Sequence, residues 1–167
     1  MFENIQSFLS TNNELAWLAI FVFAFMESFI LSGVIVSSAI LFSVCIFVYQ
    51  TEILPLYLIV PVAILGANSG DLFGFIFGKT VGPKIMSSKF MLKREKLIRR
   101  AQKFLDKTGS YTVIIGRFIP AIRPLVPFLL GISDLKTAKF YVADIIACIL
   151  WGFALALLLT GIGSLLG

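Results

Sequence analysis

The stretch "GRFIPAIRPLVPFLLG" (residues 116–131) sets two arginines and three prolines in an otherwise apolar segment. Pro120, Pro124 and Pro127 each remove a backbone hydrogen-bond donor, so a continuous helix is not expected here. Backbone interrupted in this way is tolerated at membrane depth only where it is buried in protein or lines an aqueous cavity. Residues 111–133 are therefore predicted to form a broken, re-entrant helical hairpin.

The rest of the chain has the composition of an integral membrane protein. Of its 167 residues, 59% are hydrophobic and only 14% are charged, well below the quarter or so that is typical of soluble domains. Long runs carry no charge, at residues 15–26, 28–51, 53–70 and 145–167. We predict one membrane domain over residues 1–167, with a first half (15–78), a connector (79–107) and a second half (108–167).

Positive charge is concentrated in that connector. No Lys or Arg precedes Lys79, and ten of the fourteen lie between Lys79 and Lys107, so the connector is predicted to be cytosolic. Apolar and basic residues alternate with helical spacing over residues 90–105, which fits either an amphipathic helix on the anionic inner leaflet or a solvated linker. Lipid phosphates are its nearest partners, and nucleic acid is not expected. Lys136 and Lys139 stay cytosolic only if the segment 111–133 re-enters.

The first half can be interpreted as an inverted copy of the second. The segment "MESFILSGVIVSSAIL" (26–41) has the Ser and Gly content of a helix that breaks midway, at Ser37 and Ser38. With spans at about 53–78 and 140–166, the predicted fold is an all-α membrane protein of two inverted repeats, each with a re-entrant hairpin. Residues 15–51 are also long enough for two ordinary spans, which is the alternative.

Five charged residues interrupt or border the apolar runs: Glu27, Asp71, Arg117, Arg123 and Asp144. An ionised side chain in hydrocarbon costs at least about 2.5 to 3.5 kcal/mol, so such residues usually pair or line a cavity. We expect Asp144, near the start of the last span, to reach the interface. The guanidinium fork of arginine suits phosphate, so Arg117 and Arg123 are the predicted phosphate-binding residues. Glu27 and Asp71 are the predicted proton-coupling residues, which occupy the arginines when substrate is absent.

Enzymatic functions find little support. The chain has no His, which excludes His-based acid–base catalysis, His metal ligands and Ser-His triads. An aspartyl dyad shares one proton, whereas two arginines would keep two carboxylates ionised. Cys45 and Cys148 lie in apolar runs and are expected to be small buried hydrophobic residues. No enzymatic activity, metal or cofactor is predicted.

Glycines recur at every fourth position along residues 66–82. Small residues at this period make one helix face smooth enough for close packing in lipid. The stripe therefore predicts a helix–helix seam rather than a phosphate-binding loop, which has a different spacing. Its members are Gly66, Gly70, Gly74, Gly78 and Gly82.

Three of these segments resemble the DedA family, the VTT domain proteins. "GRFIPAIRPLVPFLLG" looks like that family's R-F-x-P-x-x-R signature, and "GANSGDLFGFIFGKTVG" (66–82) looks like its G-x-x-x-G-D segment. "ESFILSGVIV", opened by Glu27, resembles the acidic start of the family's first hairpin. The last predicted span, which contains Trp151, also resembles the last span of that family. Ser37 and Ser38 stand where many members have Pro-Gly, and Ala39 stands where some have a second acidic residue.

The resemblance implies a function in lipid transport. The family is thought to move lipid phosphates, with bacterial members similar to undecaprenyl-phosphate translocases and eukaryotic relatives acting as scramblases. By position, the residues that match its functional ones are Glu27, Asp71, Arg117 and Arg123. The leading hypothesis is proton-coupled translocation of a polyprenyl phosphate or related anionic lipid in the bacterial inner membrane. A proton-coupled cation antiporter, a phospholipid scramblase and a non-transporting assembly factor are the alternatives, and homo-oligomerisation is left open.

The charge distribution generates a topological prediction. A cysteine introduced at Ser88 should react with a membrane-impermeant thiol reagent only when the cytosolic face is accessible, because ten basic residues flank or surround it. The measurement is labelling of intact cells against inside-out vesicles. Labelling in intact cells would overturn the orientation.

Overall fold

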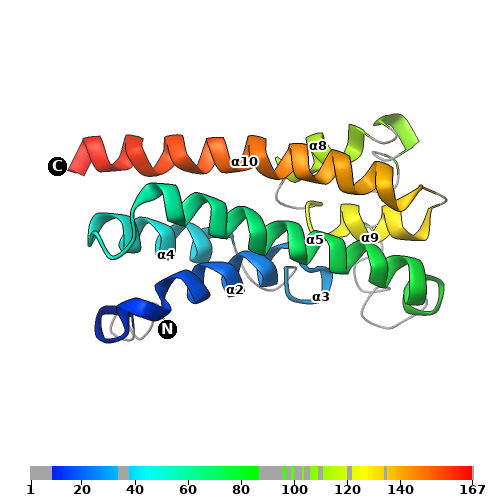
Figure 1. Ribbon diagram of the computed structural model, residues 1–167. Coiled ribbons are helices and arrows are strands. Elements are labelled where there is room, and N and C mark those ends of the chain that lie inside the picture. Colours follow the sequence, from blue (N-terminus) through cyan, green and yellow to red (C-terminus); the bar gives the residue numbers. More distant parts are fainter. Residues whose placement is uncertain are drawn as a thin grey trace.

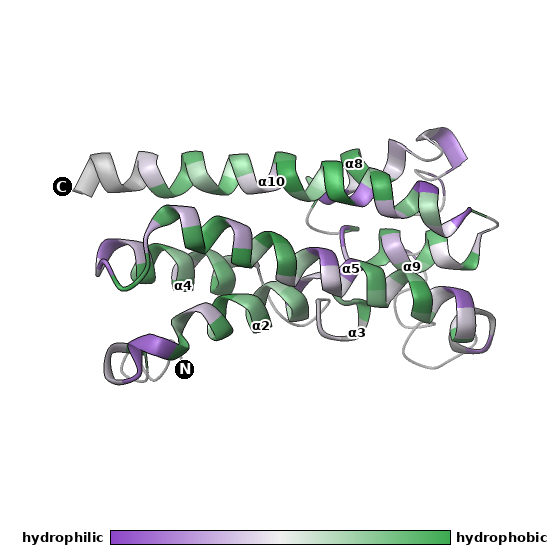
Figure 2. Cartoon of the chain, in the orientation of Figure 1, coloured by the Kyte–Doolittle hydropathy of each residue, from purple (hydrophilic) through white to green (hydrophobic). Residues whose placement is uncertain are grey.

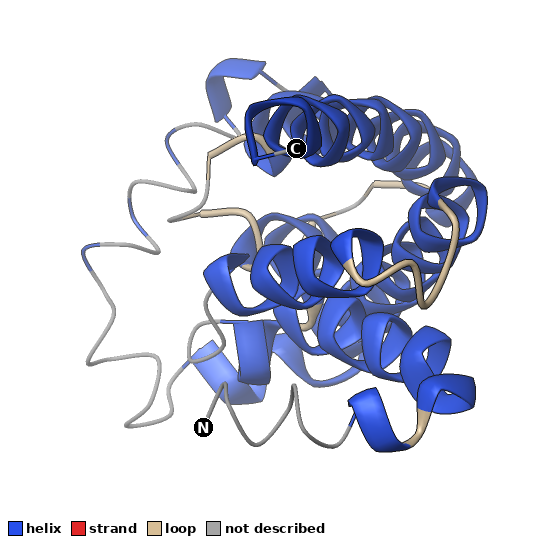
Figure 3. Ribbon diagram, turned by 90° about the vertical axis from the view of Figure 1, so that its left-hand side faces the viewer, coloured by secondary structure: helices blue, strands red, loops and turns tan. Residues whose placement is uncertain are grey.

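The computed structural model describes residues 9–33, 38–86, 96, 99, 103, 106–108, 111–119, 122–133 and 135–166. Within these residues the secondary-structure elements are helices (Figures 1 and 3). The all-α prediction is confirmed for this part of the chain. The elements are η1 (Asn13–Leu15), α2 (Ala16–Ser28), α3 (Ile30–Gly33), α4 (Ser38–Gln50), α5 (Leu56–Met86), α8 (Thr112–Arg117), α9 (Leu125–Ile132) and α10 (Thr137–Leu166).

Helices α5 and α10 form the long axis of the molecule and run antiparallel to each other (Figure 1). Apolar segments of 27 and 25 residues, Leu56–Gly82 and Thr137–Gly161, are long and hydrophobic enough to cross a membrane, which needs roughly 20 residues. The two predicted spans are therefore confirmed as long apolar helices, and both begin or end a few residues away from the predicted bounds.

The outward faces of these two helices are apolar. Leu65 and Phe73 on α5, and Phe153 and Leu157 on α10, are each 59% or more exposed. The hydrophobic colour dominates both helices (Figure 2). Soluble proteins rarely expose so continuous an apolar surface, so these faces are suited to contact lipid.

The break predicted at Ser37 and Ser38 borders residues 34–37, which lie outside the described residues, and the structure shows an earlier break after α2. Helix α2 ends at Ser28, and Phe29 has an extended backbone (φ −75°, ψ 133°) before the short α3. Helix α4 begins at Ser38, and Ser37 lies outside the described residues. Helices α2 and α4 have 13 residues each, fewer than a full crossing needs, which favours the hairpin over two ordinary spans.

The second break falls in the proline-rich segment. Helix α8 ends at Arg117 and α9 begins at Leu125, so the interruption predicted for this segment is confirmed. Pro124 precedes α9 and Pro127 lies in its first turn, where a helix leaves its backbone N–H groups without intrahelical partners and proline is tolerated. Pro120 lies outside the described residues.

The ends of the long helices are arranged as the topology prediction requires. The C-terminal end of α5 and the N-terminal end of α10 lie at the same end of the bundle (Figure 1), and Lys79 Nζ donates to Thr137 Oγ1 at 3.2 Å. Lys136 and Lys139 therefore lie at the end where the basic connector begins. Re-entrance and inverted repetition stay predictions, and the predicted amphipathic helix 90–105 falls almost wholly outside the described residues.

The glycine stripe of α5 is a packing seam against both broken segments. A Cβ added at Gly66 or Gly70 would lie 2.5 or 2.6 Å from the carbonyl oxygen of Phe21 or Phe25 in α2. Further along, a Cβ at Gly78 would meet the carbonyl oxygen of Phe128 in α9. Backbones therefore touch directly along this face, as the spacing predicted.

The seam predicts opposite effects for two substitutions in one helix. Gly78→Ala should lower the free energy of unfolding by about 1 to 3 kcal/mol, because its methyl group meets backbone that has to shift. Gly74→Ala is the matched control: its Cβ would lie 3.6 Å from Pro127 Cβ, an ordinary contact, and helix propensity favours alanine by up to about 1 kcal/mol. Reversible unfolding in mixed micelles measures both. Equal effects would show that the seam is not closely packed.

Candidate functional site

Charged and polar side chains form a buried layer between two apolar clusters. One cluster includes Ile59 and Ala67 of α5 and Trp151 of α10, and the other includes Phe75 of α5 and Phe140 of α10. The layer contains residues that are at most 5% exposed, from five different segments. Its members are Glu27, Ser28, Asp71, Arg117, Arg123 and Asp144.

Arg117 pairs with two carboxylates. It is the last residue of α8, and its Nη1 donates to Asp71 Oδ2 of α5 and, at 3.3 Å, to Asp144 Oδ1 of α10. A buried charge has to be neutralised and hydrogen-bonded to avoid a large desolvation penalty. This arginine therefore joins three helices at one point.

Arg123 makes a second ion pair in the break between α8 and α9. Its Nη1 donates to Glu27 Oε1, and its Nη2 donates to Ser28 Oγ at 3.0 Å. Glu27 is the penultimate residue of α2, and a negative charge at a helix C-terminus opposes the helix dipole. Arg123 offsets that unfavourable placement and ties the first break to the second.

The prediction for Asp144 is wrong. Its carboxylate is 1% exposed and accepts hydrogen bonds from Arg117 and, at 2.7 Å, from Asn68 Nδ2. Helix α10 begins at Thr137, so Asp144 lies two turns inside it on the face toward α5, where its short side chain cannot reach the interface. Asp144 is therefore a third buried carboxylate of the same layer.

Trp151 is a further member of the layer, to which the sequence alone assigned no role at the site. The Cζ atoms of Arg117 and Arg123 lie 5.7 and 5.1 Å from the centre of its ring, within the range of a cation–π interaction. Asp144, Cys148 and Trp151 follow one another at intervals of four and three residues, which places them on one helix face. That spacing was the signal for this face of α10.

The two arginines also line a cavity of about 210 Å³. Arg117 Nε and Nη2 and Arg123 Nε are buried and have no hydrogen-bond partner among the described residues. Nε and Nη2 form one edge of the guanidinium plane, the edge that binds carboxylate or phosphate bidentately. The cavity's other walls are mostly apolar, with Phe42, Leu155 and Leu158 among them, and Ser38 adds a hydroxyl.

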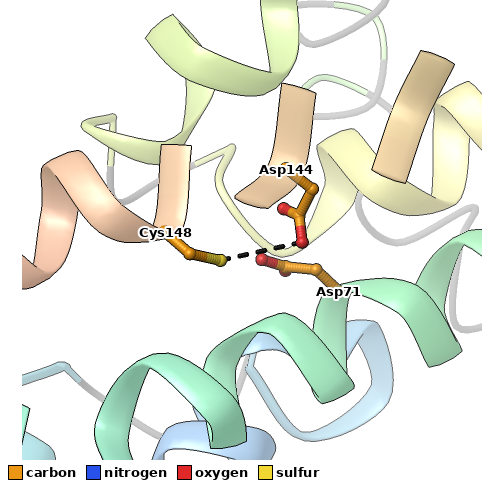
Figure 4. Close-up of side chains that lie close together, drawn as sticks. All are labelled: Asp71, Asp144 and Cys148. Atoms are coloured by element: carbon orange, nitrogen blue, oxygen red, sulfur yellow. Dashed lines mark hydrogen bonds between the residues drawn. The ribbon is translucent and has the colours of Figure 1, made fainter. Parts of the chain in front are cut away.

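A metal site at this place is not favoured. Figure 4 shows Asp71 of α5 pointing toward Asp144 and Cys148 of α10, and the Cys148 thiol donates to Asp144 Oδ2 at 3.7 Å. The oxygen and sulfur atoms of this trio lie within 4.8 Å of one another. Arg117 already pairs with both carboxylates and would repel a divalent cation. Cys45, in contrast, lies in the first apolar cluster, as predicted.

The structure thus brings together all four of the predicted site residues that carry charge. Arg117 meets Asp71, and Arg123 meets Glu27. Of the predicted hairpin-breaking residues, Ser38 lines the cavity and Pro124 is buried beside Arg123. The roles assigned to these residues stay predictions.

The long apolar helices, the broken segments and the buried arginine–carboxylate layer define a polytopic membrane protein with an ionic centre inside the bundle. The VTT domain matches residues 33–161. The chain belongs to the DedA family of membrane proteins, as the sequence motifs predicted.

Relatives of the chain are bacterial membrane proteins. The inner membrane protein YabI of Escherichia coli is 28% identical over 147 residues, which cover 88% of this chain and 58% of YabI. The uncharacterized membrane protein BU139 of Buchnera aphidicola is 31% identical over 150 residues, covering 88% and 57%. Protein DedA of E. coli is 26% identical over 103 residues, covering 61% and 47%. The chain spans about half the length of these curated relatives, and no solved structure matches it significantly.

The Glu27–Arg123 pair generates a prediction about stability. Arg123→Gln alone should lower the free energy of unfolding by about 3 to 5 kcal/mol, because Glu27 is left as an uncompensated buried charge. The double variant Glu27→Gln/Arg123→Gln should recover most of that loss. A double-mutant cycle in mixed micelles measures the coupling. Additive losses would show that the pair contributes little.

Proposed function

We propose that this chain moves a lipid-linked phosphate across the membrane, with a polyprenyl phosphate as the expected class of substrate and protons as the coupling ion. The observation that carries the proposal is that Arg117 and Arg123 line one cavity and that three of their buried guanidinium nitrogens have no hydrogen-bond partner among the described residues. Buried donors without acceptors are uncommon in folded proteins. An anionic ligand would satisfy them.

The walls of the cavity favour an amphiphilic ligand over a free anion. Both arginines and Ser38 offer donors to a phosphate group, whereas Phe42, Leu155 and Leu158 offer only apolar surface. A phosphate joined to an isoprenoid or acyl chain presents the same two chemistries. Inorganic phosphate would leave the apolar walls without a matching group.

The ion pairs suggest how the substrate would be exchanged. Glu27 and Asp71 hold the arginines through charge-assisted hydrogen bonds, which a phosphate can make equally well. As the phosphate displaces a carboxylate from its arginine, that carboxyl group loses its counter-ion and favours the protonated form. Phosphate binding and proton uptake are linked in this way.

A proton-coupled cation antiporter is less well supported. It would need Glu27 and Asp71 to share a cation, yet each pairs with a different arginine. Scrambling of phospholipids could use the same cavity and differs only in its lack of coupling. A non-transporting assembly factor would use the pairs solely to hold helices together.

Binding to the purified protein tests the proposal. Polyprenyl phosphate should bind and the corresponding polyprenyl alcohol should not. Arg117→Lys and Arg123→Lys should each weaken binding by about tenfold or more, since lysine keeps the charge but loses the bidentate edge. Arg123→Ala should abolish binding, and Glu27→Gln should retain it. Lys139→Arg, an exposed position outside the cavity, is the matched control.

Two outcomes would contradict the proposal. Parental affinity in both lysine variants would mean that the arginines act only as counter-ions, which favours the assembly factor. Cation-driven proton flux in vesicles, with no phosphate-lipid binding by the parent protein and loss of flux in Glu27→Gln, would favour the antiporter. Movement of labelled polyprenyl phosphate in proteoliposomes, with and without a pH gradient, separates a coupled transporter from a scramblase.

A further inference from the structure

The buried layer holds more negative than positive groups. Three carboxylates, Glu27, Asp71 and Asp144, face two guanidinium groups, Arg117 and Arg123, and all five side chains are at most 5% exposed. With every group ionised, the layer carries one net negative charge. A buried unpaired charge is strongly unfavourable, so one proton restores neutrality.

The geometry identifies where that proton belongs. Glu27 has an arginine of its own, Arg123, whose Nη2 also donates to Ser28 Oγ. Asp71 and Asp144 share the single Nη1 atom of Arg117. Two carboxylates on one cation repel each other, and such a pair holds one proton between them.

The surroundings of the two aspartates fit a shared proton. Asp144 Oδ2 accepts from Asn68 Nδ2 at 2.7 Å and from the Cys148 thiol, whereas Asp71 Oδ1 is buried without a hydrogen-bond partner. The side chains point toward each other from α5 and α10 (Figure 4). The charged and titratable groups facing the pair are Arg117 from α8, Arg123 from the loop before α9, Cys148 from α10 and, through Arg123, Glu27 from α2.

We propose that Asp71 and Asp144 form a carboxylate pair that holds one exchangeable proton beside Arg117, and that this pair is the proton-coupling site of the protein. The presence of a proton on this pair follows from the charges alone. The coupling of that proton to transport rests on the proposed function. A phosphate bound to Arg117 adds negative charge beside the pair and strengthens its hold on the proton. Anion and proton therefore bind together, which predicts their movement in the same direction.

Infrared spectroscopy of the purified protein tests the proton without any substrate. A protonated carboxylic acid has a C=O stretching band that a carboxylate lacks, and carbon-13 labelling of the four aspartates distinguishes it from Glu27. At neutral pH we expect this band in the parent protein and its loss in both Asp71→Asn and Asp144→Asn, since either variant leaves one aspartate for one arginine. Glu14→Gln, at an exposed position in η1, should keep the band.

Flux measurements then test the coupling. In vesicles, Asp144→Asn should abolish stimulation of phosphate-lipid movement by a pH gradient while its binding of polyprenyl phosphate survives. Thermal unfolding tests whether the asparagine variants are folded. If one of them is not, Cys148→Ala is measured in its place. This variant removes the thiol donor to Asp144 and should shift the infrared band. No aspartate band in the parent, or a band that persists in either asparagine variant, overturns the proposal. If the band behaves as expected but the parent binds no phosphate lipid, the proposed function fails and the proton pair stands.

Discussion

Charge cannot remain unpaired inside an apolar bundle, and the arrangement of this chain follows from that constraint. Arg117 and Arg123 lie only six residues apart, yet they find partners on α2, α5 and α10. To reach them, α8 has to end at Arg117 and α2 has to end beside Glu27. The helix breaks therefore place the arginines and carboxylates where they can form ion pairs.

The same constraint explains why apolar packing is divided. The side chains of α5 belong to one apolar cluster before Asp71 and to the other after it. Hydrophobic contacts stabilise each half of the bundle, and among the described residues the ionic layer connects the two halves through side-chain ion pairs. The site is thus part of what holds the fold together, and substitutions within it are expected to affect stability and activity at once.

Much of this architecture was predictable from the sequence, because composition and local chemistry determine it. Apolar length predicted α5 and α10, proline chemistry predicted the gap between α8 and α9, and the glycine period predicted a seam. The ion-pair partners were harder to predict from the sequence, because the partner of an arginine depends on how helices that are far apart in sequence are rotated relative to one another. The position of Asp144 was predicted wrongly because its distance from the start of the helix was considered without the side of the helix on which it lies. The spacing of Asp144, Cys148 and Trp151 places all three on one face, toward the inside of the bundle.

The glycine seam has a consequence for how such a chain can vary. Gly66 and Gly70 face α2, Gly74 and Gly78 face α9, and Asp71 lies at the changeover. Because each residue turns an α-helix by about 100°, one residue inserted after Gly70 would rotate every later glycine off the seam and leave the earlier ones in place. Side chains on the outer face of α5 are free to change as long as they stay apolar. The length of α5 between its contacts with α2 and with α9 cannot change in the same way. Insertions and deletions are therefore restricted to the loops.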